Sequence, residues 1–543
     1  MATGWWAIAA SLVVTVATAS LLPRLAAAAN APDISGTWVA HQNGPFGEME
    51  LIGRFKTDAA GHIGGFLTAF NDSPIRDGRV VGDHVELTVE MDSFGDVEQR
   101  QITAQLVGDE LRFDSAAFMP RMPAAPPGAP PGAAPEPGPP LEMPAPGAKT
   151  VFHRGEPRPS YRAEPIDFKT LAPVPLPAPA TVRPNKLART PPMGWNSWNK
   201  FQVRIDDKTV REMADALVAS GMRDAGYVYI NLDDGWQGRR DSNGVLQPNP
   251  NFPDMKALAD YVHGKGLKLG IYSTPGPRSC QNYEGSYGHE QIDAQTWAKW
   301  GIDYVKYDWC SGSRIWRDAD MRAVYQRMGA ALAAAGRPMV FSLCQYGRAD
   351  VRDWGTLVGG NLWRTTGDIA DRWPAMLRNV ESQDALANAA GVGHWNDPDM
   401  LEIGNGGMSA DEYRAHLSLW AIAAAPLIAG NDIRTMDATT RAILTNKEVI
   451  AVDQDRLGRP GHRVAQRGGI DVWLRSLGGG AWALVLVNRG EADAEVNATW
   501  AELNLPAKVH VRDLWQHADL GMQPTGYRGH VAAHGVAMLR LSR

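Results

Sequence analysis

Cysteine is scarce in this chain: three of its 543 residues are too few for a scaffold of several disulfides, although one bridge remains possible. A long basic run is absent and the formal net charge is −6, which argues against a protein that coats nucleic acid. Glycine and proline, at 56 and 38 residues, stay below the roughly 25–30% of disordered or fibrous chains. With 44% hydrophobic and 21% charged residues, the composition is globular, and the length suffices for roughly three or four domains.

Several catalytic motifs are missing as well. The sequence has no HExxH, no paired CxxC, no GxGxxG after a strand, no GxxxxGKS/T and no GxSxG. Its 13 histidines show no metal-ligand spacing. We therefore expect neither a metal centre nor a bound cofactor.

The N-terminal segment predicts export. Residues 1–23 contain no charged side chain, and Gly4–Val16 is almost wholly apolar, as in the core of a secretory signal peptide. Small residues that suit cleavage follow, so we expect a signal peptide over residues 1–29 and a periplasmic or extracellular protein. The alternative is an uncleaved membrane anchor, because the segment starts without Lys or Arg and is long enough to span a bilayer. No other segment is apolar enough to suggest contact with a membrane.

Residues 32–154 predict an N-terminal all-β domain, because short runs of alternating apolar residues are separated by turn residues. Residues 120–148, rich in Pro, Ala and Gly, predict a loop inserted in this domain, and 155–184 a proline-rich linker. The domain is either a binding module with a carbohydrate ligand or a spacer, and its removal should leave hydrolysis of small substrates intact. The expected strands are Met49–Phe55, Ile63–Phe70, Val85–Met91, Ile102–Val107, Leu111–Phe113 and Thr150–Arg154, with Asp77-Gly78 among the expected turns.

Residues 185–446 alternate strand-like runs with amphipathic helical stretches. Eight such repeats over this length predict a (β/α)8 TIM barrel, whose typical size is ~250 residues. Residues 460–543 are strand-rich and predict a C-terminal antiparallel β-sandwich. The fold class is therefore multidomain, with the chemistry expected at the carboxyl ends of the barrel strands.

Carboxylates and indoles follow six of the eight expected barrel strands. A single Asp after a strand is usually a helix cap or turn residue, but six such strand ends on one rim describe a concave site. Carboxylates accept hydrogen bonds from sugar hydroxyls, and aromatic faces cover the apolar face of a sugar ring. These strand ends are Trp195–Trp198, Asp233–Trp236, Lys306–Cys310, Cys344–Tyr346, Trp363–Asp368 and Trp395–Met400.

Hydrolysis of a glycoside requires two carboxyl groups beside the scissile bond. Asp308 shares one face of its strand with Lys306, whose charge would help to keep it ionised, as suits a nucleophile. Asp368 lies at a strand-to-helix turn and is a candidate proton donor. Spacing alone does not choose Asp368 over Asp371, Asp397 or Asp399.

These motifs resemble those of glycoside hydrolase family 27, the α-galactosidases and α-N-acetylgalactosaminidases. The resemblance covers the central block and the C-terminal sandwich, in family order, but not the N-terminal domain. The motifs that carry it are Leu187–Trp198, Asn231–Trp236, Gly266–Tyr272, Gly301–Asp308 and Trp395–Leu401.

The resemblance implies a role for each matching residue. Asp308 corresponds to the nucleophile and Asp368 to the acid/base, and Cys280 and Cys310 to a disulfide beside the site. Sugar-binding residues are implied at Trp198, Asp233, Asp234, Tyr272, Lys306, Arg364, Asp399 and Met400.

One position departs from the family pattern. Gln345 stands where many members have Glu, and we expect it to contact the 2-hydroxyl and to preserve preference for that group over a 2-acetamido group. No cysteine lies near Leu362 to pair with Cys344, so we expect Cys344 to be a free thiol.

The prediction is thus a retaining α-galactosidase that acts on terminal α-D-galactosides of an oligo- or polysaccharide, without nucleic acid as partner. The rival within the class is a β-L-arabinopyranosidase, because that sugar is galactose without its 6-hydroxymethyl group. The rival from another class is a galactose-binding protein without catalysis.

Overall fold

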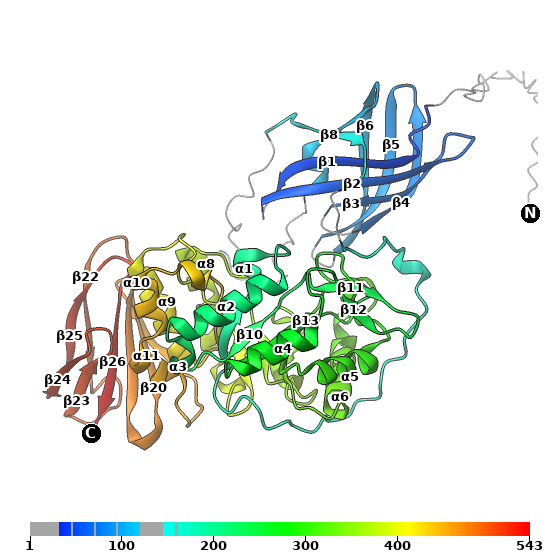
Figure 1. Ribbon diagram of the computed structural model, residues 1–543. Helices are drawn as coiled ribbons and strands as arrows, with labels where there is room; N and C mark the ends of the chain where they lie inside the picture. The colour runs from blue at the N-terminus through cyan, green and yellow to red at the C-terminus, as the bar shows by residue number, and fades with distance from the viewer. Residues whose placement is uncertain (1–31, 45–46, 70–71, 94–95, 120–144, 158–160) are drawn as a thin grey trace, which may run out of the picture.

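The computed structural model describes residues 32–44, 47–69, 72–93, 96–119, 145–157 and 161–543. Figure 1 shows three units: an N-terminal barrel of strands (the N barrel), a central barrel of strands and helices, and a C-terminal β-sandwich. The expected signal peptide at 1–29 and most of the expected loop at 120–148 lie outside the described residues. Among the helices of the described ranges, none is long and apolar enough to cross a membrane.

The N barrel is a closed barrel of eight antiparallel strands that follow one another in chain order. It closes where β1 pairs with β8, which places Trp38 opposite Arg154. Inward-facing apolar side chains, including Trp38, Phe113 and Phe152, fill its interior. The strands are β1 (Gly36–Gly44), β2 (Gly47–Thr57), β3 (Ile63–Thr68), β4 (Asp72–Val81), β5 (His84–Ser93), β6 (Asp96–Val107), β7 (Glu110–Asp114) and β8 (Lys149–Arg154).

Two of these strands, β1 and β4, were not predicted from the sequence. The predicted turn at Asp77-Gly78 is wrong, because both residues lie inside β4, paired with Thr88 and Leu87 of β5. A register shift between Ile75 and Asp77 marks a bulge that accommodates them. A Cβ at Gly78 would come within 2.8 Å of the Ile63 carbonyl oxygen, so this glycine permits a close approach of strands.

The central barrel confirms the predicted TIM-barrel architecture. Its eight parallel strands lie in the order β17-β16-β15-β14-β13-β10-β9-β18, and a single bridge, Leu401 to Ala429, spans the remaining seam. The strands are β9 (Met193–Asn196), β10 (Tyr229–Asn231), β13 (Lys268–Ser273), β14 (Tyr304–Asp308), β15 (Val340–Cys344), β16 (Leu362–Arg364), β17 (Trp395–Asp397) and β18 (Leu427–Ala429).

Helices surround these strands, and local capping sets where several of them begin. The Asp206 side chain accepts a hydrogen bond from the Thr209 amide at the start of α2, and Ser409 with Glu412 forms a capping box on α9. The helices are α1 (Trp198–Phe201), α2 (Asp207–Ala219), α3 (Met222–Ala225), α4 (Met255–Gly264), α5 (Glu290–Trp300), α6 (Met321–Ala334), α7 (Val351–Trp354), α8 (Trp373–Asp384), α9 (Ala410–Ala423), α10 (Ala438–Leu444) and α11 (Lys447–Asp453).

The C-terminal unit is the predicted β-sandwich. A six-stranded sheet in the order β19-β20-β21-β26-β23-β24 faces a two-stranded sheet of β22 and β25, with apolar residues such as Val472 and Trp500 buried between them. The strands are β19 (His462–Arg467), β20 (Ile470–Ser476), β21 (Trp482–Asn488), β22 (Ala494–Thr499), β23 (Val509–Asp513), β24 (Ala518–Gln523), β25 (Gly526–Val531) and β26 (Val536–Ser542).

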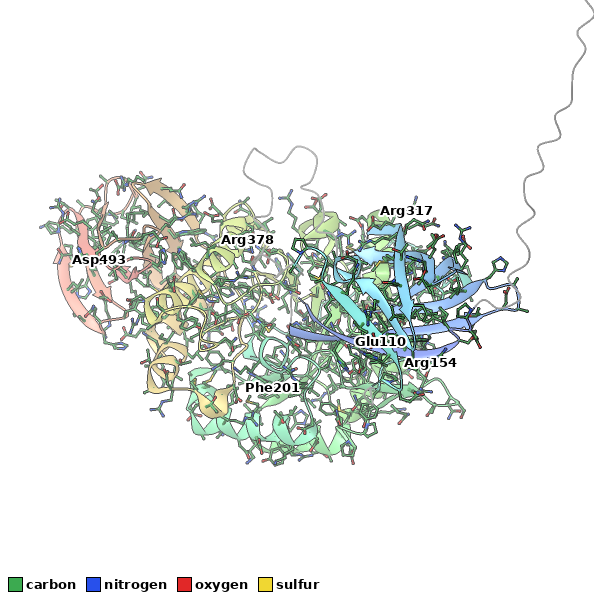
Figure 2. All side chains as sticks on the ribbon, turned by 90° about the horizontal axis from the view of Figure 1, so that it is seen from above. Glu110, Arg154, Phe201, Arg317, Arg378 and Asp493 are labelled. Carbon is green, nitrogen blue, oxygen red and sulfur yellow. A yellow bond between two sulfur atoms is a disulfide. The ribbon has the colours of Figure 1, made fainter. Side chains whose placement is uncertain are left out.

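The N barrel lies over the carboxyl ends of the central strands. Helix α1 follows β9, and a hairpin of β11 (Gln237–Arg240) and β12 (Leu246–Pro248) follows β10; both extend toward the N barrel in Figure 1. Figure 2, seen from above, shows the N barrel over one side of the central barrel and the sandwich, marked by Asp493, on the opposite side.

The expected linker, 155–184, packs along the central barrel. The Ala163 amide donates to the Asn282 carbonyl oxygen at 2.9 Å, and the Val182 amide donates to that of Leu357 at 2.8 Å. The linker is therefore held against the central barrel near both of its ends. The expectation that removal of the N barrel leaves hydrolysis of small substrates intact stays a prediction.

A buried carboxylate, Glu90 of β5, joins the N barrel, the linker segment and the central barrel. Arg76 donates two hydrogen bonds to it, at 2.8 and 2.9 Å, and Lys169 of the linker segment donates a third at 2.6 Å. Arg314, which follows β14, lies 3.5 Å from Glu90 and donates to the Asp72 carbonyl oxygen at 2.9 Å. Arg76, chiefly, holds the pKa of Glu90 at about 2.

Replacing Glu90 with glutamine should loosen the docking of the N barrel, because it removes the charged acceptor that Arg76 and the exposed Lys169 share and that lies beside the buried Arg314. Arg76 keeps its pair with Asp167, so the expected cost is about 1–3 kcal/mol. The pKa of Glu90 in the fold, about 2, is below its ordinary value of 4.5, so its contribution is present above that value and is lost as the pH falls toward 2. Limited proteolysis within 155–184, at pH 7 and pH 3, measures this docking. Glu86→Gln, on the same strand but in an exposed pair with Arg79, is the control and should change little.

Candidate active site

A pocket at the carboxyl end of the central barrel collects side chains from most of its strands. The barrel makes this possible because neighbouring parallel strands present equivalent positions side by side, as with Tyr272 and Lys306, or Asp308 and Cys344. Its lining is Trp198, Asn199, Asp233, Asp234, Tyr272, Cys280, Lys306, Asp308, Tyr346, Arg364, Asp368, Asp399 and Met400. Every predicted catalytic or sugar-binding residue except Gln345 is in this set.

Asp233 is held rigidly at the base of the pocket. Its Oδ2 accepts hydrogen bonds from Lys306 Nζ and Asn196 Nδ2, both at 2.8 Å, and its Oδ1 accepts from the Asp234 amide at 3.0 Å. Lys306 also lies 5.4 Å from the centre of the Tyr272 ring. Asp233 and Lys306 thus form a fixed pair of acceptor and donor beneath any bound molecule.

Asp234 has one carboxylate oxygen with a partner and one without. The Gln281 amide donates to Oδ2 at 2.9 Å, whereas the buried Oδ1 has no hydrogen-bond partner within the described residues. Burial, together with the charge of Asp233, raises the pKa of Asp234 to about 7. A buried acceptor without a partner is costly, so this oxygen is suited to a donor hydroxyl of a bound molecule.

Asp308, at the end of β14, is likewise held through one oxygen. Its Oδ1 accepts from the Tyr346 hydroxyl at 2.6 Å and from the Trp309 amide at 2.8 Å. Burial raises the pKa of Asp308, while Lys306 and Tyr346 oppose that rise. Its Oδ2 makes no hydrogen bond to a described residue, which leaves a fixed carboxylate with one oxygen available for reaction.

Asp368 lies at the mouth of the same pocket, after β16, with 58% of its side chain exposed. Arg364 Nη2 donates to its Oδ1 at 2.9 Å and lies 3.2 Å from Asp399 Oδ2. Arg364 is itself buried, so it positions both carboxylates from below.

The structure separates the four carboxylates that sequence spacing left open. Asp371 is occupied by the Tyr413 hydroxyl and the Gly407 amide, and neither Asp371 nor Asp397 is among the residues that line the pocket. Asp399 lines it, but its Oδ2 accepts from the Ile369 amide at 2.8 Å and is paired with Arg364. Asp368 is therefore the exposed carboxylate in the pocket.

Gln345 is not where the sequence led us to expect it. It is fully buried, outside the set of pocket-lining residues, and its Nε2 donates to the Arg364 carbonyl oxygen at 3.2 Å. The next residue, Tyr346, takes the place on the pocket wall, with a left-handed backbone (φ 59°) that turns the chain at this point. Gln345 is thus held against the backbone of Arg364 and does not line the pocket.

Sequence reasoning placed Tyr346 on the rim but gave it no role, and it missed Asn199 as a pocket residue. Both follow directly after residues that were singled out, Gln345 and Trp198, so their positions at strand ends were the available signal. The hydrogen bond from Tyr346 to Asp308 joins β15 to β14 and has no signature in either segment alone.

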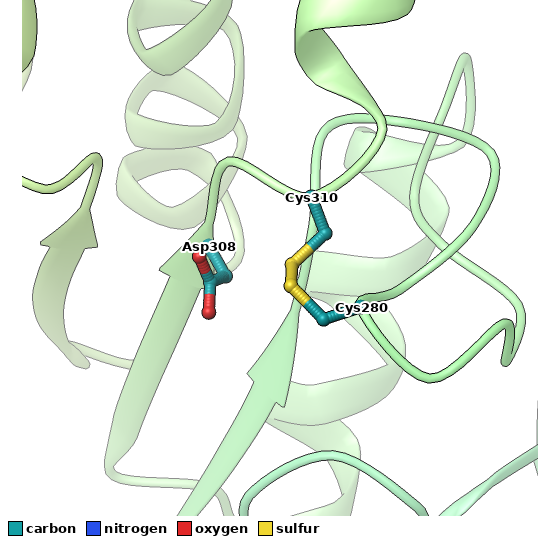
Figure 3. Close-up of side chains that lie close together, drawn as sticks. All are labelled: Cys280, Asp308 and Cys310. Atoms are coloured by element: carbon teal, nitrogen blue, oxygen red, sulfur yellow. A yellow bond between two sulfur atoms is a disulfide. The ribbon is translucent and has the colours of Figure 1, made fainter. Parts of the chain in front are cut away.

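A disulfide joins Cys280 and Cys310 beside the pocket, as the resemblance implied, and Cys344 is a buried free thiol. Figure 3 shows Asp308 next to this bridge. Cys280, Cys310 and Asp308 lie close together, but the two sulfur atoms are bonded to each other and do not offer thiolates to a metal. The Tyr272 hydroxyl lies 3.2 Å from Cys310 Sγ, so the bridge supports the pocket wall.

Two family models match the chain. One, described as alpha galactosidase A, covers residues 190–455, and one described as the alpha galactosidase C-terminal beta sandwich domain covers residues 467–541. Alpha-galactosidase 2 of Arabidopsis thaliana is 47% identical over 365 residues, which are 66% of this chain and 91% of that protein. The crystal structure of alpha-galactosidase I from Mortierella vinacea superimposes with a TM-score of 0.64 at 38% identity, over 66% of this chain and 98% of that chain.

One structural neighbour extends beyond these two units. A protein from Bacteroides fragilis, described as a candidate alpha-galactosidase/melibiase, covers 93% of this chain and 91% of its own, with a TM-score of 0.63 at 29% identity. That coverage includes the N barrel. A β-L-arabinopyranosidase from Geobacillus stearothermophilus matches with a TM-score of 0.61 at 26% identity, over 66% of this chain and 98% of that chain. Its identity to this chain is well below that of the Arabidopsis α-galactosidase.

Proposed function

Because this chain belongs to the α-galactosidase family, glycoside hydrolase family 27, and hydrolyses α-galactosides, we propose that it does so by double displacement, with Asp308 as nucleophile and Asp368 as acid and base. The observation that carries the assignment is the pair of carboxylates in one pocket. Asp308 is buried and fixed by Tyr346 and the Trp309 amide, whereas Asp368 is exposed at the mouth.

In the first step, Asp308 Oδ2 attacks the anomeric carbon while the bond from that carbon to the leaving oxygen breaks. Asp368 gives its proton to the leaving oxygen, and the galactosyl group is now bonded to Asp308 in the β configuration. In the second step, a water loses a proton to Asp368 and attacks the same carbon, which releases Asp308 as a carboxylate. Two inversions leave galactose in its original α configuration.

Sugar recognition follows from the base of the pocket. Asp234 Oδ1 accepts a hydrogen bond from either the 4- or the 6-hydroxyl of the sugar. Asp233 and Lys306, which are paired with each other, bind the ring beside that hydroxyl. Arg364 and Asp399 lie toward the 2-hydroxyl, and Trp198, Tyr272 and Met400 form walls. A carboxylate that is buried without a donor penalises any sugar that lacks the matching hydroxyl.

This arrangement predicts an order of activity on four nitrophenyl glycosides. The α-galactoside should have the highest kcat/KM and the β-L-arabinopyranoside should follow, because it lacks the 6-hydroxyl. The α-N-acetylgalactosaminide and the α-glucoside should stay near background. Steady-state rates on purified protein decide the order: a lead by the arabinopyranoside would establish the rival activity, and a lead by the acetamido sugar would refute the role given to the Arg364 side of the pocket.

The stereochemistry of the first product tests the mechanism separately. Proton NMR recorded early in hydrolysis of the α-galactoside should show α-galactose before the anomers equilibrate. Initial release of β-galactose would exclude a double displacement even if the order of substrates holds.

We also propose that the protein is exported through the apolar segment at 1–29. The support is the uncharged N-terminal run together with a disulfide, which persists in oxidising compartments. The N-terminal sequence of the protein recovered from its source organism tests this, since an intact Met1 on a membrane-bound protein would instead indicate an uncleaved anchor.

A further inference from the structure

A second cavity lies where the N barrel docks on the central barrel. Its volume is about 370 Å³, within the ~300–1,000 Å³ of pockets that bind small molecules. One wall is the outer surface of strands β1 to β4, and the other is formed by the segment after β8 together with parts of the central barrel. The lining residues that matter are Arg54, Thr68, Asp72, Arg162, Arg239 and Asn282.

Asp72 contributes a buried carboxylate to the lining of this cavity. Its side chain is 2% exposed, its Oδ1 accepts from the Thr68 hydroxyl at 2.8 Å, and its Oδ2 has no hydrogen-bond partner within the described residues. Burial raises the pKa of Asp72, and the charges of Arg278, Arg54 and Arg162 oppose that rise only in part. A buried acceptor of this kind favours a ligand that brings a donor.

The charges around the cavity favour a neutral ligand over an ion. Arg239 is already paired with Glu164, at 3.0 Å. Arginine and acidic side chains occur in equal number in the lining, so neither an anion nor a cation is favoured by net charge. Guanidinium donors, carboxylate acceptors, hydroxyls and an amide together suit the hydroxyls of a sugar. The acidic members are Asp72, Glu156 and Glu164, and the arginines are Arg54, Arg162 and Arg239.

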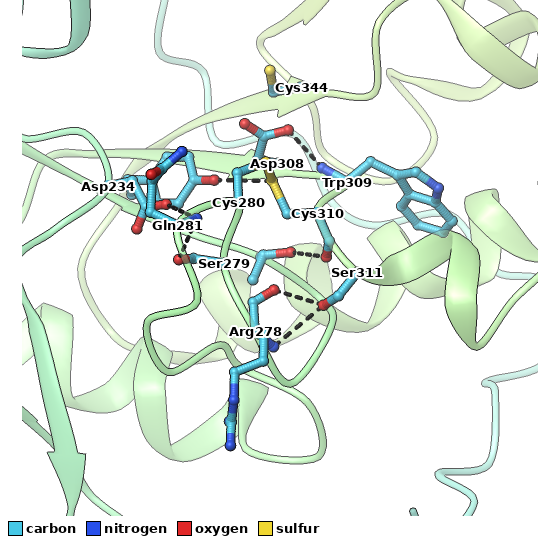
Figure 4. The surroundings of a disulfide bond; sticks show 12 residues. Asp234, Arg278, Ser279, Cys280, Gln281, Asp308, Trp309, Cys310, Ser311 and Cys344 are labelled. Carbon is cyan, nitrogen blue, oxygen red and sulfur yellow. Dashed lines mark hydrogen bonds between the residues drawn. A yellow bond between two sulfur atoms is a disulfide. The ribbon is translucent and has the colours of Figure 1, made fainter. Parts of the chain in front are cut away.

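One short loop separates this cavity from the active site. Cys280 lines the catalytic pocket and the Gln281 amide holds Asp234, whereas the following residue, Asn282, lines the second cavity. Figure 4 shows Cys280 and Gln281 on the catalytic side, next to Asp234. The disulfide to Cys310 anchors this loop, and the Asn282 carbonyl oxygen accepts from Ala163 of the docked segment.

We propose that the interdomain cavity is a second carbohydrate subsite, which binds a neutral sugar unit on the aglycone side of an oligosaccharide substrate. This rests on the proposed function, since it names the kind of α-galactoside that the enzyme prefers. The N barrel thereby takes part in substrate selection: a galactoside with a single-unit aglycone fills the catalytic pocket alone, and a longer one also reaches the cavity.

The test compares melibiose, raffinose and stachyose, whose aglycones have one, two and three sugar units. The wild-type full chain should show kcat/KM rising with aglycone length. Arg54→Ala and Arg162→Ala should raise KM for stachyose about tenfold, because each removes a charged donor, and should leave melibiose within about twofold. Asp72→Asn should act in the same direction. Arg79→Ala, on the exposed part of β4, is the matched control and should change neither substrate.

Calorimetric titration of stachyose into full-length Asp308→Asn, with and without Arg54→Ala, measures the subsite without turnover. Weaker binding of stachyose by the double variant than by Asp308→Asn alone supports the proposal. Equal losses on all three sugars, no loss on any, or no gain with aglycone length in the wild type would overturn it. Failure of the proposed function is distinct: it would show as absent hydrolysis of nitrophenyl α-galactoside by the wild type, while calorimetry would still report on the cavity.

Discussion

Replacement of Asp308 by asparagine should lower kcat for nitrophenyl α-galactoside by on the order of 10⁴-fold or more, with the fold intact. The amide matches the carboxylate in size and keeps an oxygen that can accept from Tyr346 and the Trp309 amide, but it cannot attack the anomeric carbon. Thermal unfolding should stay near that of the wild type, because burial raises the pKa of Asp308 and so disfavours its charged form in the fold.

The smaller variant Asp308→Gly tests the assignment of Asp308 as nucleophile in a different way. With azide present, the anion can enter the space left by the carboxylate and displace the aglycone directly, in a single inversion. The product should be β-galactosyl azide. Asp318→Asn, an exposed carboxylate beyond the pocket, serves as the control and should keep full activity. A variant of Asp308 that retains more than a tenth of wild-type kcat without azide would remove it from the role of nucleophile.

Replacement of Asp368 by alanine should have the second largest effect, and one that depends on the leaving group. Nitrophenolate leaves without much help from an acid, so the first step should persist while hydrolysis of the galactosyl-enzyme slows by about 10²–10⁴-fold. Melibiose, whose leaving group needs the proton, should lose activity in the first step as well. A burst of nitrophenol in stopped-flow measurements should reveal the trapped intermediate.

Azide should rescue Asp368→Ala with the opposite stereochemistry. Here the anion attacks the β-linked galactosyl-enzyme, and a second inversion gives α-galactosyl azide. Asp371→Asn is the matched control, because sequence spacing did not separate the two residues and Asp371 is occupied by Tyr413 and Gly407 outside the pocket. If azide gave the β product, or if Asp371→Asn reproduced the burst, the assignment of Asp368 as acid and base would be wrong.

Much of the catalytic unit was predictable from sequence because its information is local. Each central strand is a short buried run, and the residues that follow it, such as Asp233 and Asp308, reach the same rim in any (β/α)8 barrel. The motif resemblance added the roles and the Cys280–Cys310 pairing. Alternation also indicated most strands of the N barrel.

The errors occurred where local signals compete with long-range pairing. The Asp77-Gly78 pair reads as a turn, but strand β4 continues through it because β5 supplies the ladder partners and a bulge absorbs the irregularity. Gln345 was expected on the pocket wall, but the chain turns at the left-handed backbone of Tyr346, and Tyr346 rather than Gln345 lines the pocket.

The sequence by itself determined the order of the three units, the parallel barrel, and a rim of carboxylates and indoles around Asp308, because periodicity and strand-end residues are properties of short segments. Strand spacing did not separate Asp368 from Asp371 or Asp397, and the motif resemblance alone singled out Asp368. The tertiary structure showed that Asp368 shares the pocket with Asp308 as an exposed carboxylate and that the other two do not line it. It also decided that the N barrel docks over the active-site end through Glu90. Both features depend on contacts between residues far apart in the chain. Which polar groups come together there is set by how the chain folds back on itself and not by the local preferences of short segments.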